Sequence, residues 1–265
     1  MPRIRSTSRE ELKEWFDEVL ILDIFRFDRA YGLLETVGTH ADRINADPTN
    51  FGELFGTIQD LAKTSALVHA ARLFDSPRGR NRPRSLVTLL NDLADGDTEL
   101  PALEAREELM DFLRRTGIRN DAGSDRELLR LTGEAMGAQL DEEQISARLD
   151  RFRKIRNKRI VHHEGAAFHV RQSWKDVHAL VDEARSMLGV LGFAFFRTVY
   201  IHSGHEWTLC GDATRPSRAL ELLLTDLEII EDEGPHGAHM HEHRKKKIRE
   251  QRSERRGQAD GASDA

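Results

Sequence analysis

The sequence predicts an all-α protein, a helical bundle with two long helices and several shorter ones. Three observations support this fold class. Apolar residues recur at helical spacing along most of the chain. Residues that cap or end helices stand at the boundaries of those segments. Alternation of apolar and polar residues is brief wherever it occurs, as in AAFHV after Gly165, so we expect little strand.

The first long helix is predicted to begin after Ser8, because Ser8 and Glu11 have the spacing of a capping box. Its helical periodicity continues to Gly38. A second helix is predicted over residues 50–74. Its apolar side holds Phe51, Leu54, Phe55, Ile58, Leu61 and Leu67.

Shorter helices are predicted in the middle of the chain. The segment DSPRGRNRPR is rich in Pro and Gly and is predicted to be a loop. Ser85 then caps a helix that Gly96 ends. Two further helices are predicted around residues 102–115 and 126–136.

The last predicted helices include the second long one. One helix begins at Asp141 and ends by Gly165. Ser173 caps the long helix, which runs from 174 to about 199. Pro216 opens a final helix that reaches about Glu231, since proline is favoured in the first turn.

The domain boundary is predicted near residue 232. Residues 1–232 hold the helical segments and are expected to form one domain. Residues 233–265 have almost nothing to bury, so we expect a disordered tail. Imidazoles suit zinc or nickel, but a disordered segment pre-forms no geometry, so we predict no metal site in this tail. Its histidines are His236, His239, His241 and His243.

Charge and cysteine content narrow the class of protein. The last 22 residues hold eight basic and four acidic side chains, so with a net charge of −6 for the whole chain the remainder carries −10. Such an acidic body is unlike a dedicated duplex-DNA binder. The single cysteine, Cys210, excludes an internal disulfide and a cysteine-clustered metal site. No signal peptide and no membrane-spanning run is visible, so we expect a cytoplasmic protein.

The stretch IRNKRIVHHE, residues 155–164, contains the candidate functional residues, an arginine and two histidines at the end of an amphipathic segment. On a helical wheel Arg156 falls in the centre of an apolar stripe, and His163 returns close to it seven residues later. An unpaired buried guanidinium costs several kcal/mol. Arg156 is therefore predicted either to form a structural ion pair or to line a functional cleft or an interface, and the wheel alone leaves these alternatives open.

The same stretch resembles the signature of the HEPN superfamily of all-α domains. Arg156 is followed by the polar Asn157, then by KRIV, then by His162. The motif with its following glycine, the long first helix, ALVHAARLFD and SLVTLLNDL resemble the abortive-infection AbiU-like branch in their order. The resemblance covers roughly residues 10 to 200, and it implies a HEPN-like helical bundle.

The resemblance also implies an activity. Such domains act as metal-independent endoribonucleases without a cofactor, often as homodimers whose motifs face one composite cleft. By this resemblance Arg156 would clamp the phosphate and His162 would act as acid or base. Asn157 would orient a motif side chain or the phosphate. The spacing admits His163 in place of His162; we choose His162 and keep His163 as a substitute or helper.

The predicted function is therefore RNA cleavage in phage defence or as a toxin, with a protein antitoxin as an optional partner. The alternative is a non-catalytic helical module that binds RNA or a protein and keeps Arg156 in a structural ion pair. A nucleotide-binding regulator has less support, because no phosphate-binding loop is visible.

Two other features were weighed for RNA binding. The arginines of PRGRNRPR suit either RNA contact or a solvated loop, and both remain open. They are Arg78, Arg80, Arg82 and Arg84. The tryptophans Trp15, Trp174 and Trp207 occupy apolar periodic contexts. We therefore expect them in the core and predict no stacking platform.

Overall fold

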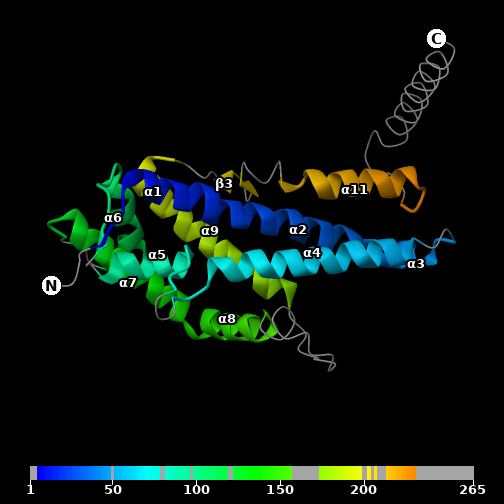
Figure 1. Ribbon diagram of the computed structural model, residues 1–265, viewed down its shortest axis with the longest axis horizontal. Coiled ribbons are helices and arrows are strands. Elements are labelled where there is room, and N and C mark those ends of the chain that lie inside the picture. Colours follow the sequence, from blue (N-terminus) through cyan, green and yellow to red (C-terminus); the bar gives the residue numbers. More distant parts are fainter. Residues whose placement is uncertain are drawn as a thin grey trace, which may run out of the picture. The chain divides into compact units, whose positions relative to one another are not determined.

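A computed structural model describes residues 5–48, 51–77, 81–95, 98–118, 122–156, 173–198, 202–203, 206–207 and 213–230. Helices dominate these residues, so the predicted all-α class is confirmed (Figure 1). The described helices are α1 (Arg9–Glu14), the π-helix η1 (Trp15–Leu20), α2 (Ile21–Thr39), α3 (Ala41–Ala46), α4 (Gly52–Leu73), α5 (Leu86–Asp95), α6 (Arg106–Arg115), α7 (Asp125–Asp141), α8 (Glu143–Arg156), α9 (Trp174–Phe196) and α11 (Arg215–Asp226).

Two pairs of very short strands accompany the helices. The strand β1 (Arg5–Ser6) runs parallel to β2 (Thr98–Glu99), and β3 (His202–Ser203) runs antiparallel to β4 (Glu206–Trp207). Each strand has two residues, which is too short for a periodic pattern to be visible in the sequence.

The chain divides into two compact units. The first contains residues 1–31 and 60–214, and the second contains residues 32–59 and 215–265. The unit boundaries fall inside α2 and α4, at positions where helical periodicity continues without a break. The sequence prediction of one helical domain over residues 1–232 remains a prediction, and the expected tail of residues 233–265 lies outside the described residues.

Local chemistry accounts for several helix ends. At the start of α1 the backbone N–H of Glu11 donates to Ser8 Oγ over 3.1 Å, and the Ser8 N–H donates to Glu11 Oε2 over 2.9 Å. The predicted capping box is thus confirmed. Ser85 caps α5 by accepting from the Thr88 N–H over 3.1 Å. These bonds satisfy backbone donors that a helix leaves free in its first turn.

The predicted first helix departs from a regular α-helix at one place. Residues 15–20 form the π-helix η1, so one continuous helical segment from Arg9 to Thr39 contains a wider turn. Trp15, Phe16 and Leu20 of this turn are buried. Helical periodicity does not distinguish a single π-turn from α-helix, and for this reason the sequence did not show it.

Other boundaries differ modestly from those predicted. The helix α7 continues to Asp141, five residues beyond the expected end, because Leu140 still packs in the core. The helix α6 begins at Arg106 rather than near 102, and α11 ends at Asp226. The short helix α3 was not predicted.

Each unit has its own apolar core. The core of the first unit is formed by α1, η1, the start of α2, the end of α4, and α5 to α9. The second unit has a smaller cluster, in which α2, α3, α4 and α11 contribute buried residues. These residues are Val37, Ile44, Phe55, Leu220, Leu224 and Ile229.

The helices α5 and α7 pack closely in the first unit because Gly133 of α7 has no side chain. A Cβ placed on Gly133 would lie 2.7 Å from the Ala94 backbone nitrogen, 2.7 Å from Leu93 Cβ and 2.9 Å from the Leu90 carbonyl oxygen. Backbone atoms cannot move aside as a flexible side chain can. This glycine therefore sets the separation of α5 from α7.

We predict that Gly133→Ala lowers the free energy of unfolding by about 1–3 kcal/mol, because the added methyl group overpacks the contact. Gly137→Ala is the matched control, since a Cβ there meets nothing within 4 Å on the same helix. It should raise the free energy of unfolding by about 0.5–1 kcal/mol. Urea unfolding of both variants measures this, and equal effects would contradict the packing argument.

Candidate functional site at the end of helix α8

The candidate motif begins at the last residue of α8. Arg156 ends this helix, and its side chain lies outside the described part of the structure. Asn157, His162 and His163 also lie outside the described residues. The proposed roles of these four residues therefore stay predictions. The described residues next to the motif are those that hold the end of α8.

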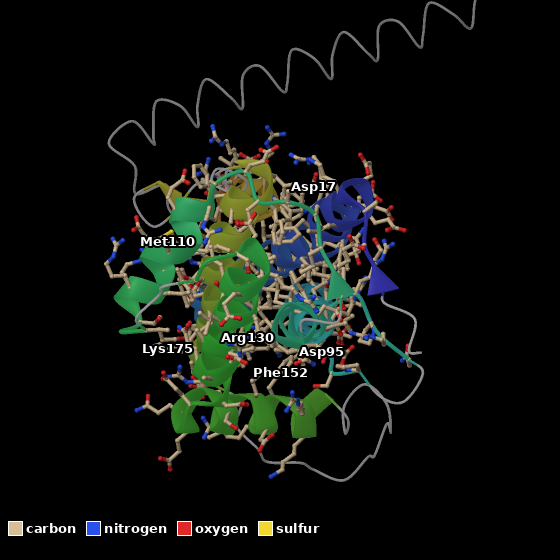
Figure 2. The ribbon with its side chains drawn as sticks, turned by 90° about the vertical axis from the view of Figure 1, so that its left-hand side faces the viewer. Asp17, Asp95, Met110, Arg130, Phe152 and Lys175 are labelled. Carbon is tan, nitrogen blue, oxygen red and sulfur yellow. The ribbon has the colours of Figure 1, made fainter. Side chains whose placement is uncertain are left out.

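The apolar stripe of α8 is packed as the helical wheel predicts. Ile145, Leu149 and Phe152 are buried, and α8 packs on both α7 and α9. Figure 2 shows Phe152 between α8 and the helices above it. The position of Arg156 follows Phe152 by four residues, one turn further along the same face.

An ion-pair cluster fastens α8 to the first turn of α9. One carboxylate oxygen of Asp176 lies 3.2 Å from Arg148 Nε, and the other lies 3.4 Å from Arg151 Nη2. Asp176 is in the first turn of its helix, where a negative charge is favoured by the helix dipole. Two arginines on successive turns of α8 therefore converge on one carboxylate, and this fixes the direction of α8 as it approaches the motif.

A second contact holds the last turn of α8 to the segment after α4. The Arg153 side chain donates from Nη2 to Ser76 Oγ over 3.3 Å, and its Nη1 lies 3.6 Å from Asp150 Oδ1. The end of α8 is thus held from α9 and from the segment that follows α4. Figure 1 shows α8 alongside the end of α7 and the beginning of α9.

The described surface of α8 carries an excess of positive charge. Residues 148–154 of this helix hold four basic side chains and one acidic one. Lys154 is exposed and has no ion pair among the described residues. The acidic body of the chain therefore presents a local basic surface next to the motif, which is the charge that a phosphate backbone requires.

The arginine-rich loop contributes less to this surface than its composition suggests. Arg82 pairs with the buried Asp92, and Arg84 Nη1 lies 2.6 Å from Glu14 Oε1. These two arginines tie the loop to α5 and α1. Arg78 and Arg80 lie outside the described residues, so for them RNA contact and solvation both remain open.

A cavity of about 430 Å³ lies beside this loop. Pro77, Arg82, Asn91, Ala94 and Asp95 line it.

A buried charge network lies on the side of α9 that faces α2. Arg185 is buried and pairs with Asp28 of α2 and with Asp182 one turn earlier on α9. The Nδ1 atom of His178 lies 2.8 Å from the other Asp182 oxygen. Burial raises the pKa of Asp182, but the hydrogen bond from His178 and the charge of Arg185 outweigh it, so the pKa lies below its ordinary value.

Glu183, the next residue, is shifted in the opposite direction. Burial raises the pKa of its carboxyl, and the charges of Glu142 and Asp182 raise it further. Arg148 and the hydrogen bond that Gln139 Nε2 donates over 2.9 Å oppose this effect without cancelling it. The ionised form of Glu183 is therefore disfavoured in the folded chain.

Asp176 and Arg185 were not among the site residues predicted from the sequence. Asp176 follows Ser173 by three residues, the spacing at which acidic residues support a helix start, so a weak signal was present. Nothing in the sequence marks Asp28 as the partner of Arg185, because 157 residues separate the two. Among the described residues no group of three or more His, Cys, Asp or Glu side chains is arranged to hold a metal ion.

A match to a protein-family model identifies the family to which the chain belongs. The family model HEPN_AbiU2, described as AbiU2, matches residues 9–213. The chain belongs to the AbiU2 family of HEPN domains. The match covers α1 through α9 and the whole IRNKRIVHHE stretch, so the predicted resemblance and the HEPN-like fold are confirmed. No curated protein and no solved structure matches the chain.

Membership of the AbiU2 family supports a HEPN-type role in abortive infection. Within the described residues of this HEPN domain, no helix combines the length and the apolar content that a membrane crossing requires.

We predict that Glu183→Gln raises the melting temperature of this AbiU2-family domain at pH 7. The folded pKa of Glu183 lies above its unfolded value, so the folded state binds this proton more tightly and loses stability as pH rises through the folded pKa. The gain from the substitution should shrink as pH falls through the folded pKa of Glu183 and should be lost below the ordinary pKa of glutamate. Thermal unfolding followed by circular dichroism from pH 4 to pH 8 measures it.

Glu127→Gln is the control for this experiment. The hydrogen bond and the charge of Arg130 lower the pKa of Glu127, so its ionised form is the favoured one. Its replacement should not raise the melting temperature at any pH in this range. A gain at Glu183 that did not depend on pH would contradict the electrostatic cause.

Proposed function

We propose that this AbiU2-family HEPN domain is a metal-independent endoribonuclease that acts in phage defence or as a toxin. One observation carries the proposal. In a chain of HEPN membership, the motif begins with Arg156 as the last residue of a basic helix whose last turns are held by Asp176 and Ser76. A catalytic group needs such positioning, because small displacements reduce rates strongly.

The proposed reaction uses a nucleophile that RNA itself supplies. The 2′-oxygen attacks the adjacent phosphorus while the bond from phosphorus to the 5′-oxygen breaks. A base takes the proton of the 2′-hydroxyl, and an acid gives a proton to the leaving 5′-oxygen. The products are a 2′,3′-cyclic phosphate and a 5′-hydroxyl, so no water and no metal ion is needed as a reactant.

Each motif residue has a proposed role in this reaction. Arg156 binds the phosphate through two hydrogen bonds and stabilises the charge that builds up in the transition state. His162 is the acid or base, because imidazole titrates near neutral pH. His163 substitutes for it or assists, and Asn157 orients the phosphate or a motif side chain. A homodimer would place two motifs in one cleft and so supply both proton-transfer groups.

The competing function is a non-catalytic helical module that binds RNA or a protein partner. In that case Arg156 forms a structural ion pair like that of Arg185 with Asp28, which shows that this chain does use buried arginine in this way. Arg148 and Arg151 pair with Asp176, so α8 too has arginines with structural partners.

We predict that the purified protein cleaves single-stranded RNA in EDTA and leaves 2′,3′-cyclic phosphate ends. Arg156→Ala and His162→Ala should each lower the cleavage rate by at least about 100-fold, the usual contribution of acid–base catalysis or of one charge-stabilising group. Arg114→Ala is the control, because Arg114 is an exposed arginine of α6 that pairs with Asp111. Its rate should equal that of the unaltered protein.

His163→Ala separates the two histidines. Cleavage that survives His162→Ala and is lost in His163→Ala would move the acid–base role to His163. A folded, dimeric protein that cleaves none of a varied set of RNAs would favour the binding module. Light scattering during gel filtration establishes the oligomeric state in the same preparations.

We also predict that Asp176→Asn lowers the cleavage rate by several-fold, because the amide weakens both ion pairs that direct α8. This decrease in rate should be modest, since half-exposed ion pairs contribute about 1 kcal/mol or less to stability. Asp150→Asn is the matched control, because Asp150 pairs with Arg153 within α8 alone. Equal rates for the two variants would show that the tie to α9 does not position the motif.

A further inference from the structure

An aromatic cluster lies where α9 begins. The Tyr31 ring, from α2, lies with its centroid 5.0 Å from that of His178 and 6.5 Å from that of Trp174, at interplanar angles of 53° and 52°. Phe27, one turn before Tyr31, stacks on it at 5.7 Å and 13°. The rings of three residues therefore converge on Tyr31, namely His178 and Trp174 of α9 and the buried Phe27 of α2.

The outer rings of this cluster are incompletely covered. Trp174, Tyr31 and His178 are half-buried, whereas Trp15 and Phe16 of the same unit are buried in the core. The expectation that Trp174 is a core residue is thus only partly met. A large amphipathic ring that keeps an accessible part is suited to contact a flat partner.

The orientation of the His178 ring is fixed by a hydrogen bond to Asp182. Asp182 contacts its Nδ1 atom over 2.8 Å, and Arg185 and Asp28 extend the same network into the interior. Fixed rings lose little conformational entropy when a ligand stacks on them. The cluster is therefore preorganised for such a contact.

The cluster lies close to the motif helix. Trp174 is the first residue of α9, and Asp176, two residues later, binds Arg148 and Arg151 of α8. The motif begins at Arg156, the last residue of α8, and Trp174 is the first residue of α9. The rings therefore lie beside the helix that delivers Arg156.

The charges around the cluster suit a polyanion. Lys175 follows Trp174, is exposed, and has no ion pair among the described residues, as is also true of Lys154 at the end of α8. Figure 2 shows Lys175 at the margin of the bundle. The nearby acids Asp176 and Asp182 are already paired with arginine or histidine. Two arginines share Asp176, so a phosphate that approaches Lys175 beside α8 meets uncompensated positive charge, whereas Asp28 and Asp182 share the single Arg185.

We propose that Trp174, with Tyr31 and His178, forms a stacking subsite for an unpaired base of single-stranded RNA, whose phosphate Lys175 contacts. This inference rests on the proposed function and adds a substrate-binding site outside the motif. Stacking on aromatic rings accepts any base but requires that the base be unpaired. The subsite therefore selects single-stranded RNA over duplex and places a nucleotide next to the motif.

The test compares two substitutions of Trp174 in the full-length chain. Trp174→Phe keeps an aromatic face, whereas Trp174→Leu keeps apolar packing against the core but removes the face. The probe is a 2′-O-methyl adenosine octamer with a 5′-fluorescein, which has no free 2′-hydroxyl and so is not cleaved. Binding is followed by fluorescence anisotropy, and circular dichroism compares the folding of the variants.

Trp174→Phe should bind the octamer within about twofold of the unaltered protein, and Trp174→Leu should bind it at least about fivefold more weakly. A duplex of the same sequence should bind the unaltered protein, Trp174→Phe and Trp174→Leu with equal affinity. A merely structural role for Trp174 would leave binding to the octamer unchanged in the Leu variant, and that result overturns the proposal.

Tryptophan emission gives a second measurement that needs only well-folded chains. The unlabelled octamer should quench part of the emission of the unaltered protein, and this part should be missing in Trp174→Phe. Equal quenching in the two proteins, or no binding of the octamer by the unaltered protein, overturns the stacking subsite.

The two proposals fail in different ways. RNA cleavage together with unchanged octamer binding by Trp174→Leu removes the stacking subsite and keeps the nuclease. Trp174-dependent binding without any cleavage keeps the subsite and removes the nuclease.

Discussion

The packing of α9 is the constraint on which the rest of the first unit depends. One face of this helix is buried along nearly its whole length, from Val177 to Phe196. The helices α6 and α8 pack on it, and Arg185 ties it to α2. At its far end the Ala194 carbonyl accepts from the backbone N–H groups of Glu104 and Ala105. A long buried helix with partners at both ends can set the position of each neighbour, and the motif helix is one of those neighbours.

Some ion pairs of this chain join two helices and others lie within one helix, and both kinds shape the charge of the surface near the motif. Asp176 is shared by two arginines of α8, and Asp182 is shared by His178 and Arg185. Each such pair removes an acid that would repel RNA. Because the pairs use up carboxylates while Lys154 and Lys175 keep their charges free among the described residues, a chain with a net charge of −6 can still present a basic surface locally.

The same interactions connect fold and proposed chemistry. A nuclease that uses the 2′-hydroxyl of RNA needs a phosphate held against an acid–base pair, and it needs the strand to enter as single-stranded RNA. The motif begins at the end of α8, and the start of α9, together with Tyr31 of α2, supplies the aromatic rings. Asp176 joins the two places, so one carboxylate relates the motif helix to the proposed base-binding surface.

The sequence by itself determined the helical class, most helix positions and the family, because periodicity and caps are local properties and the motif is contiguous. Ser8 with Glu11 and the stripe of Ile145, Leu149 and Phe152 are examples. The π-turn at residues 15–20, the separation of α5 from α7 at Gly133 and the pairing of Arg185 with Asp28 came only from the tertiary structure. The pairing and the close approach depend on residues distant in the chain, and a single wide turn leaves helical periodicity nearly unchanged. The half-burial of Trp174 also depends on distant residues. Its apolar neighbours in the sequence predict burial, but the packing of α9 against other helices decides which face of the ring remains accessible.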